Sequence, residues 1–291
     1  MKAPPFDYHR PESLRDALLL LKQPDARILA GGQSLVPMLN FRLLAPHHLI
    51  DLSQIGELRT CVVTSEKIRI GAMVSQRELE RSAELSRAAP IFPEAIRQIG
   101  HRQTRNRGTI GGSLCHLDPS AELPALALLH DAIFEIESSE GARHVKAQDF
   151  IQGAMNPALE EGEILTHVEM PVWQSGHGFA FLEHARRAGD FAMASAGILV
   201  AADGDGRIAR LAICIGGLAD RPMRLAAAES ELIGARPDKE MFNRAASHIA
   251  ALPAEGSIHA SAAYKRRIAE TLLKRALEAA CDRAALIAGV A

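Results

Sequence analysis

The chain has 291 residues, of which 47% are hydrophobic and 23% are charged, and its formal net charge is −2. This length fits two or three compact units better than one small core. The nearly neutral charge balance argues against a general nucleic-acid binder, because neutralising phosphates requires a basic face. No stretch approaches the ~18–20 uncharged apolar residues of a membrane span, and residues 1–7 lack the apolar segment of a secretory signal. We therefore expect a cytoplasmic protein.

The four cysteines, Cys61, Cys115, Cys214 and Cys281, are scattered along the chain and form no Cys-x-x-Cys pair. Structural zinc sites and iron–sulfur clusters normally need clustered thiolates. No His-x-x-x-His pair is present either. Two disulfides are arithmetically possible, but the expected compartment disfavours them. We expect no metal on this chain, so any metal or cluster chemistry would lie on another chain.

The first part of the chain is predicted to contain a β-α-β unit. Leucines and alanines recur at helical spacing after Ser13, which is suited to cap a helix. The predicted elements up to residue 57 are a helix over 12–23, a strand over 27–30, a helix over about 34–41 and a strand over 49–52.

From about residue 58 the pattern changes to short strands. The predicted elements are strands over 58–63 and 67–71 around a turn at 65–66, helices around 75–82 and 90–98, a glycine-rich stretch over 108–113, and strands over 132–137 and 164–170. Residues 132–137 (AIFEIE) alternate as a half-buried strand should.

Residues 173–178 (WQSGHG) are predicted to form a linker. The elements expected after it are strands over 194–202 and 210–215, then helices over about 222–235, 238–251 and 259–288. The order is mixed α and β first, then a small sheet with a helical bundle.

Two glycine pairs share a pattern, because each follows an apolar stretch and precedes a serine. The first lies in residues 30–34 (AGGQS) and the second in residues 109–113 (TIGGS). Glycine lets the backbone adopt positive φ and approach a ligand, so that successive N–H groups converge on an anion. The serine hydroxyl adds a donor, and a following helix adds the positive end of its dipole. One pair alone is typical of a tight turn, but two such loops predict a diphosphate held from opposite sides.

Residues 204–209 (GDGRIA) match the pattern Gly-x-Gly-x-x-Ala of nicotinamide dinucleotide sites. That fingerprint must open a helix, whereas residues 210–213 are strand-like. Residues 203–206 (DGDG) are better interpreted as a hairpin turn between two strands. We therefore reject a nicotinamide site at this position.

Residues 116–124 (HLDPSAELP) follow the second glycine pair directly, so Asp118 and Glu122 are expected near any ligand there. A carboxylate accepts hydrogen bonds from ribityl or ribose hydroxyls. The structural alternative is that Asp118 caps a turn and Glu122 caps the helix that follows. For Asp118 we favour the turn, and for Glu122 both interpretations stay open.

Two arginine-rich segments have a structural and a functional interpretation. Arg102, Arg105 and Arg107 precede the second glycine pair, and we favour a solvated face over contact with a diphosphate or partner. Residues 186–192 (RRAGDFA) place two arginines beside Phe191, which is a candidate flat neighbour for a flavin ring.

Taken in order, these segments resemble the flavin-binding medium subunits of the molybdenum hydroxylases, the family of the carbon monoxide and xanthine dehydrogenase flavoproteins. The resemblance covers nearly the whole chain and rests on the number, order and spacing of its motifs. These are residues 27–37 (RILAGGQSLVP), 42–43 (RL), 68–72 (IRIGA), 109–114 (TIGGSL), 118–119 (DP), 122–124 (ELP), 162–165 (GEIL), 186–192 (RRAGDFA) and 264–267 (YKRR).

The resemblance implies an α+β fold with two domains. The first, over residues 1–176, is an FAD-binding domain of the vanillyl-alcohol-oxidase-like type with subdomains of about 1–57 and 58–176. The second, over residues 177–291, has a small three-stranded antiparallel sheet and a three-helix bundle.

The resemblance also implies that both glycine segments hold the FAD diphosphate, that Glu122 contacts its ribityl or diphosphate region, and that Leu165 and Glu183 lie beside the isoalloxazine. The positions expected to bind FAD are Leu29, Ala30, Gly31, Gly32, Gln33, Ser34, Leu35, Val36, His101, Thr109, Ile110, Gly111, Gly112, Ser113, Glu122, Leu165 and Glu183. Ser113 stands where the family commonly has Asn, and Glu122 where it commonly has Asp. Both replacements keep hydrogen-bonding capacity but alter the contact geometry.

In such complexes a large subunit carries a molybdenum–pterin cofactor and hydroxylates the substrate. A small subunit carries [2Fe–2S] clusters and passes electrons to the FAD, which hands them to an external acceptor. The resemblance thus implies an electron-transfer subunit in a dimer of heterotrimers, with no catalytic residue of its own.

Two other classes of function remain open. A stand-alone FAD oxidase or dehydrogenase of related fold would need a substrate pocket with an acid–base pair near the flavin. It would also be expected to link the flavin through a residue such as His116 or Cys115. A flavin-free scaffold subunit is the third interpretation, and the two intact glycine pairs speak against it.

Overall fold

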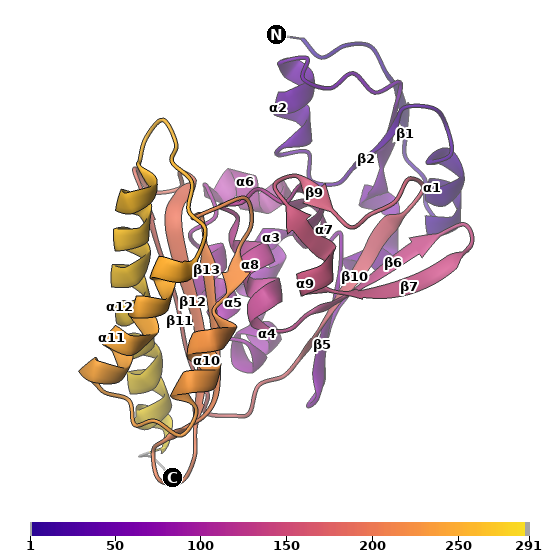
Figure 1. Cartoon of the computed structure of the whole chain (residues 1–291). Coiled ribbons are helices and arrows are strands. Elements are labelled where there is room, and N and C mark those ends of the chain that lie inside the picture. Colours follow the sequence, from indigo (N-terminus) through magenta and orange to yellow (C-terminus); the bar gives the residue numbers. More distant parts are fainter. Residues whose placement is uncertain (1, 289–291) are drawn as a thin grey trace.

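The N-terminal β-α-β unit is present in the computed structural model, which describes residues 2–288 and the side chains of residues 2–284. Strands β2 (Ala26–Leu29) and β3 (His48–Asp51) are parallel and flank α2 (Leu35–Asn40). A third strand, β1 (Asp7–His9), pairs parallel with β3 on its other side. Ser13 caps α1 (Leu14–Leu20) by accepting a hydrogen bond from the Asp16 amide. This unit lies at the end of the molecule away from the C-terminal helices (Figure 1).

The second sheet has five antiparallel strands in the order β4-β5-β10-β6-β7. They are β4 (Cys61–Val63), β5 (Lys67–Gly71), β10 (Ile164–Pro171), β6 (Ile133–Ser138) and β7 (Gly141–Lys146). The alternation seen in the sequence buries one face of each strand, so Ile68, Ile70, Phe134 and Ile136 enter the main core.

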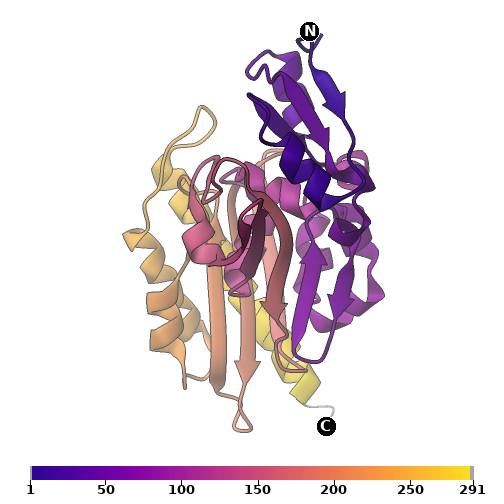
Figure 2. The ribbon, with the colours of Figure 1, turned by 90° about the vertical axis from the view of Figure 1, so that its right-hand side faces the viewer.

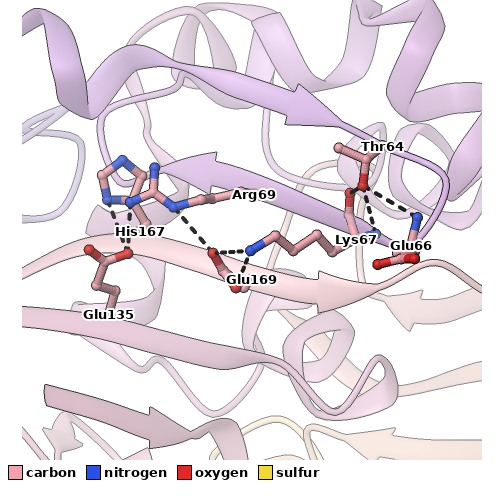
Figure 3. Close-up of polar contacts among 7 residues, drawn as sticks. All are labelled: Thr64, Glu66, Lys67, Arg69, Glu135, His167 and Glu169. Carbon is pink, nitrogen blue, oxygen red and sulfur yellow. Dashed lines mark hydrogen bonds and ion pairs between the residues drawn. The ribbon is translucent and has the colours of Figure 1, made fainter.

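The outer face of this sheet carries a line of charged side chains across three strands (Figure 3). Arg69 of β5 binds Glu135 of β6 at 2.7 Å and Glu169 of β10 at 3.3 Å. Lys67 reaches the same Glu169 at 3.1 Å, and His167 lies 3.8 Å from Glu135. Opposite charges on neighbouring strands favour this register over a one-residue slip, which would bury the ladder.

A layer of short helices lies between the five-stranded sheet and the C-terminal sheet (Figure 1), and Figure 2 shows again that the N-terminal unit lies apart from the C-terminal helices. These helices are α3 (Gln76–Arg81), α4 (Ala83–Ala88), α5 (Ile91–Ile96), α6 (Arg102–Arg107), α7 (Ile110–His116), α8 (Glu122–Leu129) and α9 (Ala147–Phe150). A two-stranded sheet of β8 (Ile151–Gly153) and β9 (Asn156–Pro157) follows α9. Helix α8 is apolar on all sides because it is buried between the two larger sheets.

The C-terminal sheet is antiparallel, in the order β11-β12-β13-β14. Its strands are β11 (Gly178–Ala185), β12 (Ala192–Ala202), β13 (Ile208–Gly216) and β14 (Met223–Arg224). Helices α5 and α8 cover one face of it. The other face is covered by α10 (Ala226–Leu232), α11 (Lys239–Ser247) and the long α12 (Ala262–Ala288), as Figure 1 shows.

Several expectations need correction. Residues 58 and 59 belong to a 3-10 helix, Gly56–Arg59, rather than to a strand, because Leu58 turns inward and is fully buried. The C-terminal sheet has four strands instead of three, since residues 223–224 pair with β13. The helix expected over 12–23 covers only Leu14–Leu20, and the one expected over 238–251 becomes a 3-10 turn, His248–Ala251, after Ser247. The hairpin at 203–206 is confirmed.

The segment expected to be a linker is packed rather than free. Trp173 is only 3% exposed, and the Arg210 guanidinium lies 3.9 Å from the centre of its ring. The main core also includes Phe181 and Leu199 of the C-terminal sheet together with residues of the five-stranded sheet. Residues 173–178 therefore run between parts of the chain that share one core.

A substitution at Gly178, at the start of β11, tests the contact between the sheet and α12. A Cβ at this position would overlap the carbonyl oxygen of Ala280 in α12. We expect Gly178→Ala to lower the free energy of unfolding by about 1–3 kcal/mol, as overpacking commonly does. Urea unfolding followed by circular dichroism measures this change. Gly204→Ala is the control, because a Cβ there meets nothing within 4 Å; equal midpoints for the two variants would contradict the contact.

Candidate functional site

The first glycine segment joins β2 to α2 and leaves several donors free. Gly32 has a φ of +72°, which favours glycine. Among residues 2–288, the backbone N–H groups of Gly32, Gln33 and Ser34 donate to no protein acceptor. Ser34 is the N-cap of α2, yet its hydroxyl makes no capping hydrogen bond. Amide and hydroxyl donors are therefore available here to a ligand.

The second glycine segment is the first turn of a helix rather than the loop that its sequence suggested. Thr109 is the N-cap of α7, and its hydroxyl accepts a hydrogen bond of 3.0 Å from the Gly112 amide. The Gly111 amide donates to Ala72 and the Ile110 amide to Val74, at 2.9 and 3.1 Å. These three amides already have protein partners, so they do not converge on an anion as expected.

The glycines of the second segment instead permit close packing between neighbouring backbones. A Cβ on Gly111 would lie 2.5 Å from the Ala72 Cβ, and one on Gly112 would lie 2.9 Å from the Thr109 hydroxyl and 3.5 Å from the Ala30 Cβ. A Cβ on Gly31 would overlap the Arg107 carbonyl oxygen. The two glycine segments are thus in contact, and the missing side chains are what allow it.

Two carboxyl groups from distant parts of the chain form a pair. Glu122 is the first residue of α8, and Glu183 lies on β11. Their side chains lie close enough for each to affect the pKa of the other. Burial, together with the charges of Glu183 and Asp118, raises the pKa of Glu122 to about 8. Burial also raises the pKa of Glu183, to about 7. Because the two groups titrate together, the pair holds a proton near neutral pH.

A cavity of about 180 Å³ lies next to this pair. It is lined by Gln98, Glu183, His184, Ala185, Arg187, Ala188 and Gly189. Gly189 has a φ of +79°, and a Cβ on it would lie 2.9 Å from the Gly100 carbonyl and 3.0 Å from the His101 ring. The loop after β11 is therefore packed against the turn that precedes α6.

Other predicted site residues occupy different environments. Leu165 is 3% exposed and belongs to the main core, whereas Val36 is 41% exposed on α2. Leu29 and Leu35 are half-buried on either side of the first glycine segment, and the exposed His101 is the N-cap of α6. Ser113 is half-buried in α7. The structure therefore separates a buried position, Leu165, from residues that a ligand in solvent can reach.

The three arginines before the second glycine segment and Asp118 have different roles. Arg105 is held by Glu80 at 3.0 Å and by the Ile99 carbonyl at 2.9 Å, so it fixes the turn before α6. Arg102 and Arg107 are exposed, as a solvated face predicts. Asp118 accepts a hydrogen bond from the Ser120 amide at 2.8 Å, which agrees with the turn-capping interpretation.

Matches to known families cover almost the whole chain. Residues 4–173 match the model described as the FAD binding domain in molybdopterin dehydrogenase, and residues 179–280 match the carbon monoxide dehydrogenase flavoprotein C-terminal domain. The medium chain of carbon monoxide dehydrogenase from Afipia carboxidovorans is 39% identical over 96% of this chain and 98% of that one. This chain belongs to the FAD-binding medium subunits of the molybdenum hydroxylases.

Other members of the family match this chain over nearly the full length of both proteins. The alpha subunit of the 6-hydroxypseudooxynicotine dehydrogenase complex from Paenarthrobacter nicotinovorans is 37% identical, over 98% of this chain and 97% of that one. A chain in the crystal structure of quinoline 2-oxidoreductase from Pseudomonas putida 86 superposes with a TM-score of 0.94 at 36% identity, covering 98% and 99% of the two chains. The medium subunit described here is accordingly a flavoprotein of oxidoreductase complexes.

The residues present fit a flavin dinucleotide. The free amides of the first glycine segment suit a diphosphate, and the proton-holding carboxyl pair suits ribityl hydroxyls, which both donate and accept. Within the part of the chain that the structure describes, no group of three or more His, Cys, Asp or Glu side chains could hold a metal ion. No helix among these residues is long and apolar enough to cross a membrane.

Gln98, Arg187 and Gly189 line the cavity beside Glu183 but were not among the predicted FAD-binding positions. The sequence carried a signal for Arg187 and Gly189, because both lie in the RRAGDFA motif that supported the resemblance. Gln98 belongs to a segment with no glycine and no motif, so only the fold brings it to the site.

The carboxyl pair predicts how the stability of the flavin-free medium subunit depends on pH. Both carboxyl pKa values are raised above the ordinary 4.5, so between about pH 4.5 and 8 the folded chain retains protons that the unfolded chain releases. The stabilisation is complete at low pH and is lost as the pH rises through 7 and 8. We expect the melting temperature to fall over this range, and to fall less in Glu183→Gln. Differential scanning fluorimetry measures it, with Glu140→Gln on the exposed β6–β7 turn as control; parallel profiles for all three proteins would contradict the pairing.

Proposed function

We propose that the FAD diphosphate lies between residues 30–34 and 109–113 and that this medium subunit passes electrons from a partner to an external acceptor. The observation that carries the first part is the set of free donors in the first segment, at Gly32, Gln33 and Ser34, held in contact with the start of α7. The second segment contributes the Ser113 hydroxyl and a surface without side chains. The two segments therefore contribute differently to binding. Residues 30–34 donate hydrogen bonds to the diphosphate, and residues 109–113 allow it to approach the backbone closely.

The other predicted positions are assigned to the rest of the flavin. Glu122 accepts from or donates to the ribityl hydroxyls, and Leu165, Glu183 and His101 belong to the isoalloxazine end. The bound flavin supplies the redox chemistry, exchanging electrons one or two at a time. The chain's own residues bind and orient it, and no residue of this chain needs to act as a general base on the hydroxylated substrate.

The partners follow from the relatives. Relatives named as medium chains or subunits act in complexes named for carbon monoxide, glyceraldehyde and nicotine, so the same fold serves chemically different substrates. This supports placing substrate hydroxylation on a large molybdenum–pterin subunit and the [2Fe–2S] clusters on a small subunit. We infer a cytoplasmic dimer of heterotrimers, in which residues 1–176 form the FAD-binding domain, with subdomains of about 1–57 and 58–176, and residues 177–291 form the C-terminal domain.

The purified chain tests this function directly. We expect a yellow protein that releases FAD on denaturation, identified by chromatography, and that turns over no N-heteroaromatic or aldehyde substrate by itself. Co-expression with the reading frames beside its gene should recover a three-subunit complex whose flavin is reduced by substrate. Substrate turnover by the chain alone would contradict the proposal and support a stand-alone flavoenzyme.

Ser34 provides a sharper test of the diphosphate site. Its hydroxyl caps nothing, so Ser34→Ala should leave the melting temperature of the apo-protein unchanged. The dissociation constant for FAD should rise about tenfold or more, because a hydrogen bond to a charged group contributes about 1.5–3 kcal/mol. Flavin fluorescence titration of the deflavinated chain measures it.

Ser13→Ala is the matched control, since the Ser13 hydroxyl caps α1. It should lower stability by about 1 kcal/mol and leave FAD affinity unchanged. Equal FAD affinities for Ser34→Ala and the parent chain would remove Ser34 from the site.

A further inference from the structure

Glu183 interrupts an apolar row. Phe179, Phe181 and Glu183 alternate along β11, and Phe181 enters the core that α8 also joins. Across the sheet Glu183 is paired in register with the buried Ser195 of β12. Burying a carboxyl in such a row costs free energy unless it is partnered, and its partner is Glu122 at the start of α8.

The contact between these two carboxyls requires a proton. Ionised carboxyl oxygens only accept hydrogen bonds, and Glu183 Oε2 is buried with no protein donor. A single proton between the two side chains supplies that donor and removes one of two like charges. With it the pair has a net charge of −1, and without it two buried carboxylates repel each other.

Several charged groups on the surrounding elements are bound to other partners. The titratable groups on the surrounding elements are Asp118 before α8, Cys115 and His116 at the end of α7, Glu94 of α5, His184 and Arg187 after Glu183, Lys265 of α12, and Asp131 and Arg224 beyond the far end of α8. Glu94 is bound to Arg283 at 2.8 Å, Arg224 to Asp131 at 2.7 Å, and the Lys265 ammonium to the Gly217 carbonyl at 3.0 Å. The Asp118 charge acts on Glu122 in the same direction as that of Glu183.

We propose that Glu183 is a positioning residue that shares one proton with Glu122 and thereby makes FAD binding by this subunit proton-linked. This inference rests on the proposed function, because it requires FAD to lie beside Glu122. Glu122 begins α8, which packs against α7, so the pair adjoins the helix that starts at the second glycine segment. Loss of the shared proton adds a second negative charge beside a ligand that is itself negatively charged, and it drives the two carboxyls apart. FAD affinity therefore falls as the pH rises above neutrality.

The experiment is an FAD titration of the deflavinated full chain between pH 6 and pH 9, read by quenching of flavin fluorescence. We expect the dissociation constant of the parent chain to rise by about tenfold or more over this range, since a coupled titration changes affinity by up to tenfold per pH unit. In Glu183→Gln the amide donates to the Glu122 carboxylate at every pH. The profile of this variant should change by less than about twofold.

Two further variants complete the test. Glu122→Gln leaves the same single charge and should flatten the profile as Glu183→Gln does, so it decides the question if the first variant does not fold. Glu137→Gln is the matched control: burial also raises the pKa of this carboxyl, but it lies on β6 beside α1, and this variant should follow the parent profile.

The outcomes separate this inference from the proposed function. A parent profile that is flat with pH, or a Glu183→Gln profile as steep as the parent's, would overturn the shared proton while leaving FAD binding intact. A chain with no saturable FAD binding at any pH would overturn the proposed function itself.

Discussion

The approach of Gly31 to the backbone at Arg107 brings together parts of the chain that belong to different cores. A side chain at position 31 would overlap the Arg107 carbonyl oxygen, so this contact exists only with glycine. The first segment follows β2, which packs with α1 around Leu18 and Ile50. The second segment begins α7, whose Ile110 and Leu114 belong to the main core. Replacing Gly31 would separate the two cores before it changed any polar contact.

This contact explains why the amides of the two glycine pairs have different hydrogen-bond partners despite their similar sequences. In the second segment, the carbonyls of Ala72 and Val74 and the Thr109 hydroxyl take the amides that a free loop would offer to an anion. Those bonds hold α7 against β5 and the residues after it. The first segment then lies against a fixed surface, and its own amides at Gly32 to Ser34 remain free. Rigidity on one side and free donors on the other suit a ligand that must be oriented.

Much of the fold could be predicted because local patterns agree with tertiary packing. The alternation of residues 132–137 and the DGDG turn at 203–206 each specify a strand or hairpin without distant partners. The start of α7 could not be predicted, because two adjacent glycines are poor helix formers and only the contacts with Ala72 and Val74 make the turn helical. The sequence predicts a strand from Leu58 because the segment continues into the apolar residues 61–63, but the Leu58 side chain is buried, its carbonyl lies against Gly71, and the backbone forms a 3-10 helix.

The candidate site shows the same division between local and non-local information. Both glycine segments and Glu122 carry local motifs, so they could be named from the sequence, whereas the pairing of Glu122 with Glu183 joins residues from a helix and a strand that no pattern links. A charged residue in the apolar row of Phe179 and Phe181 was the one available signal. A buried acid in a core-facing row lowers stability when ionised, so its presence is better explained by the proposed flavin site than by folding. A bound dinucleotide that touches both glycine segments would also stabilise the junction of the two cores, by an amount set by its affinity and concentration. Ligand retention and stability of the N-terminal unit are therefore coupled through the contact at Gly31.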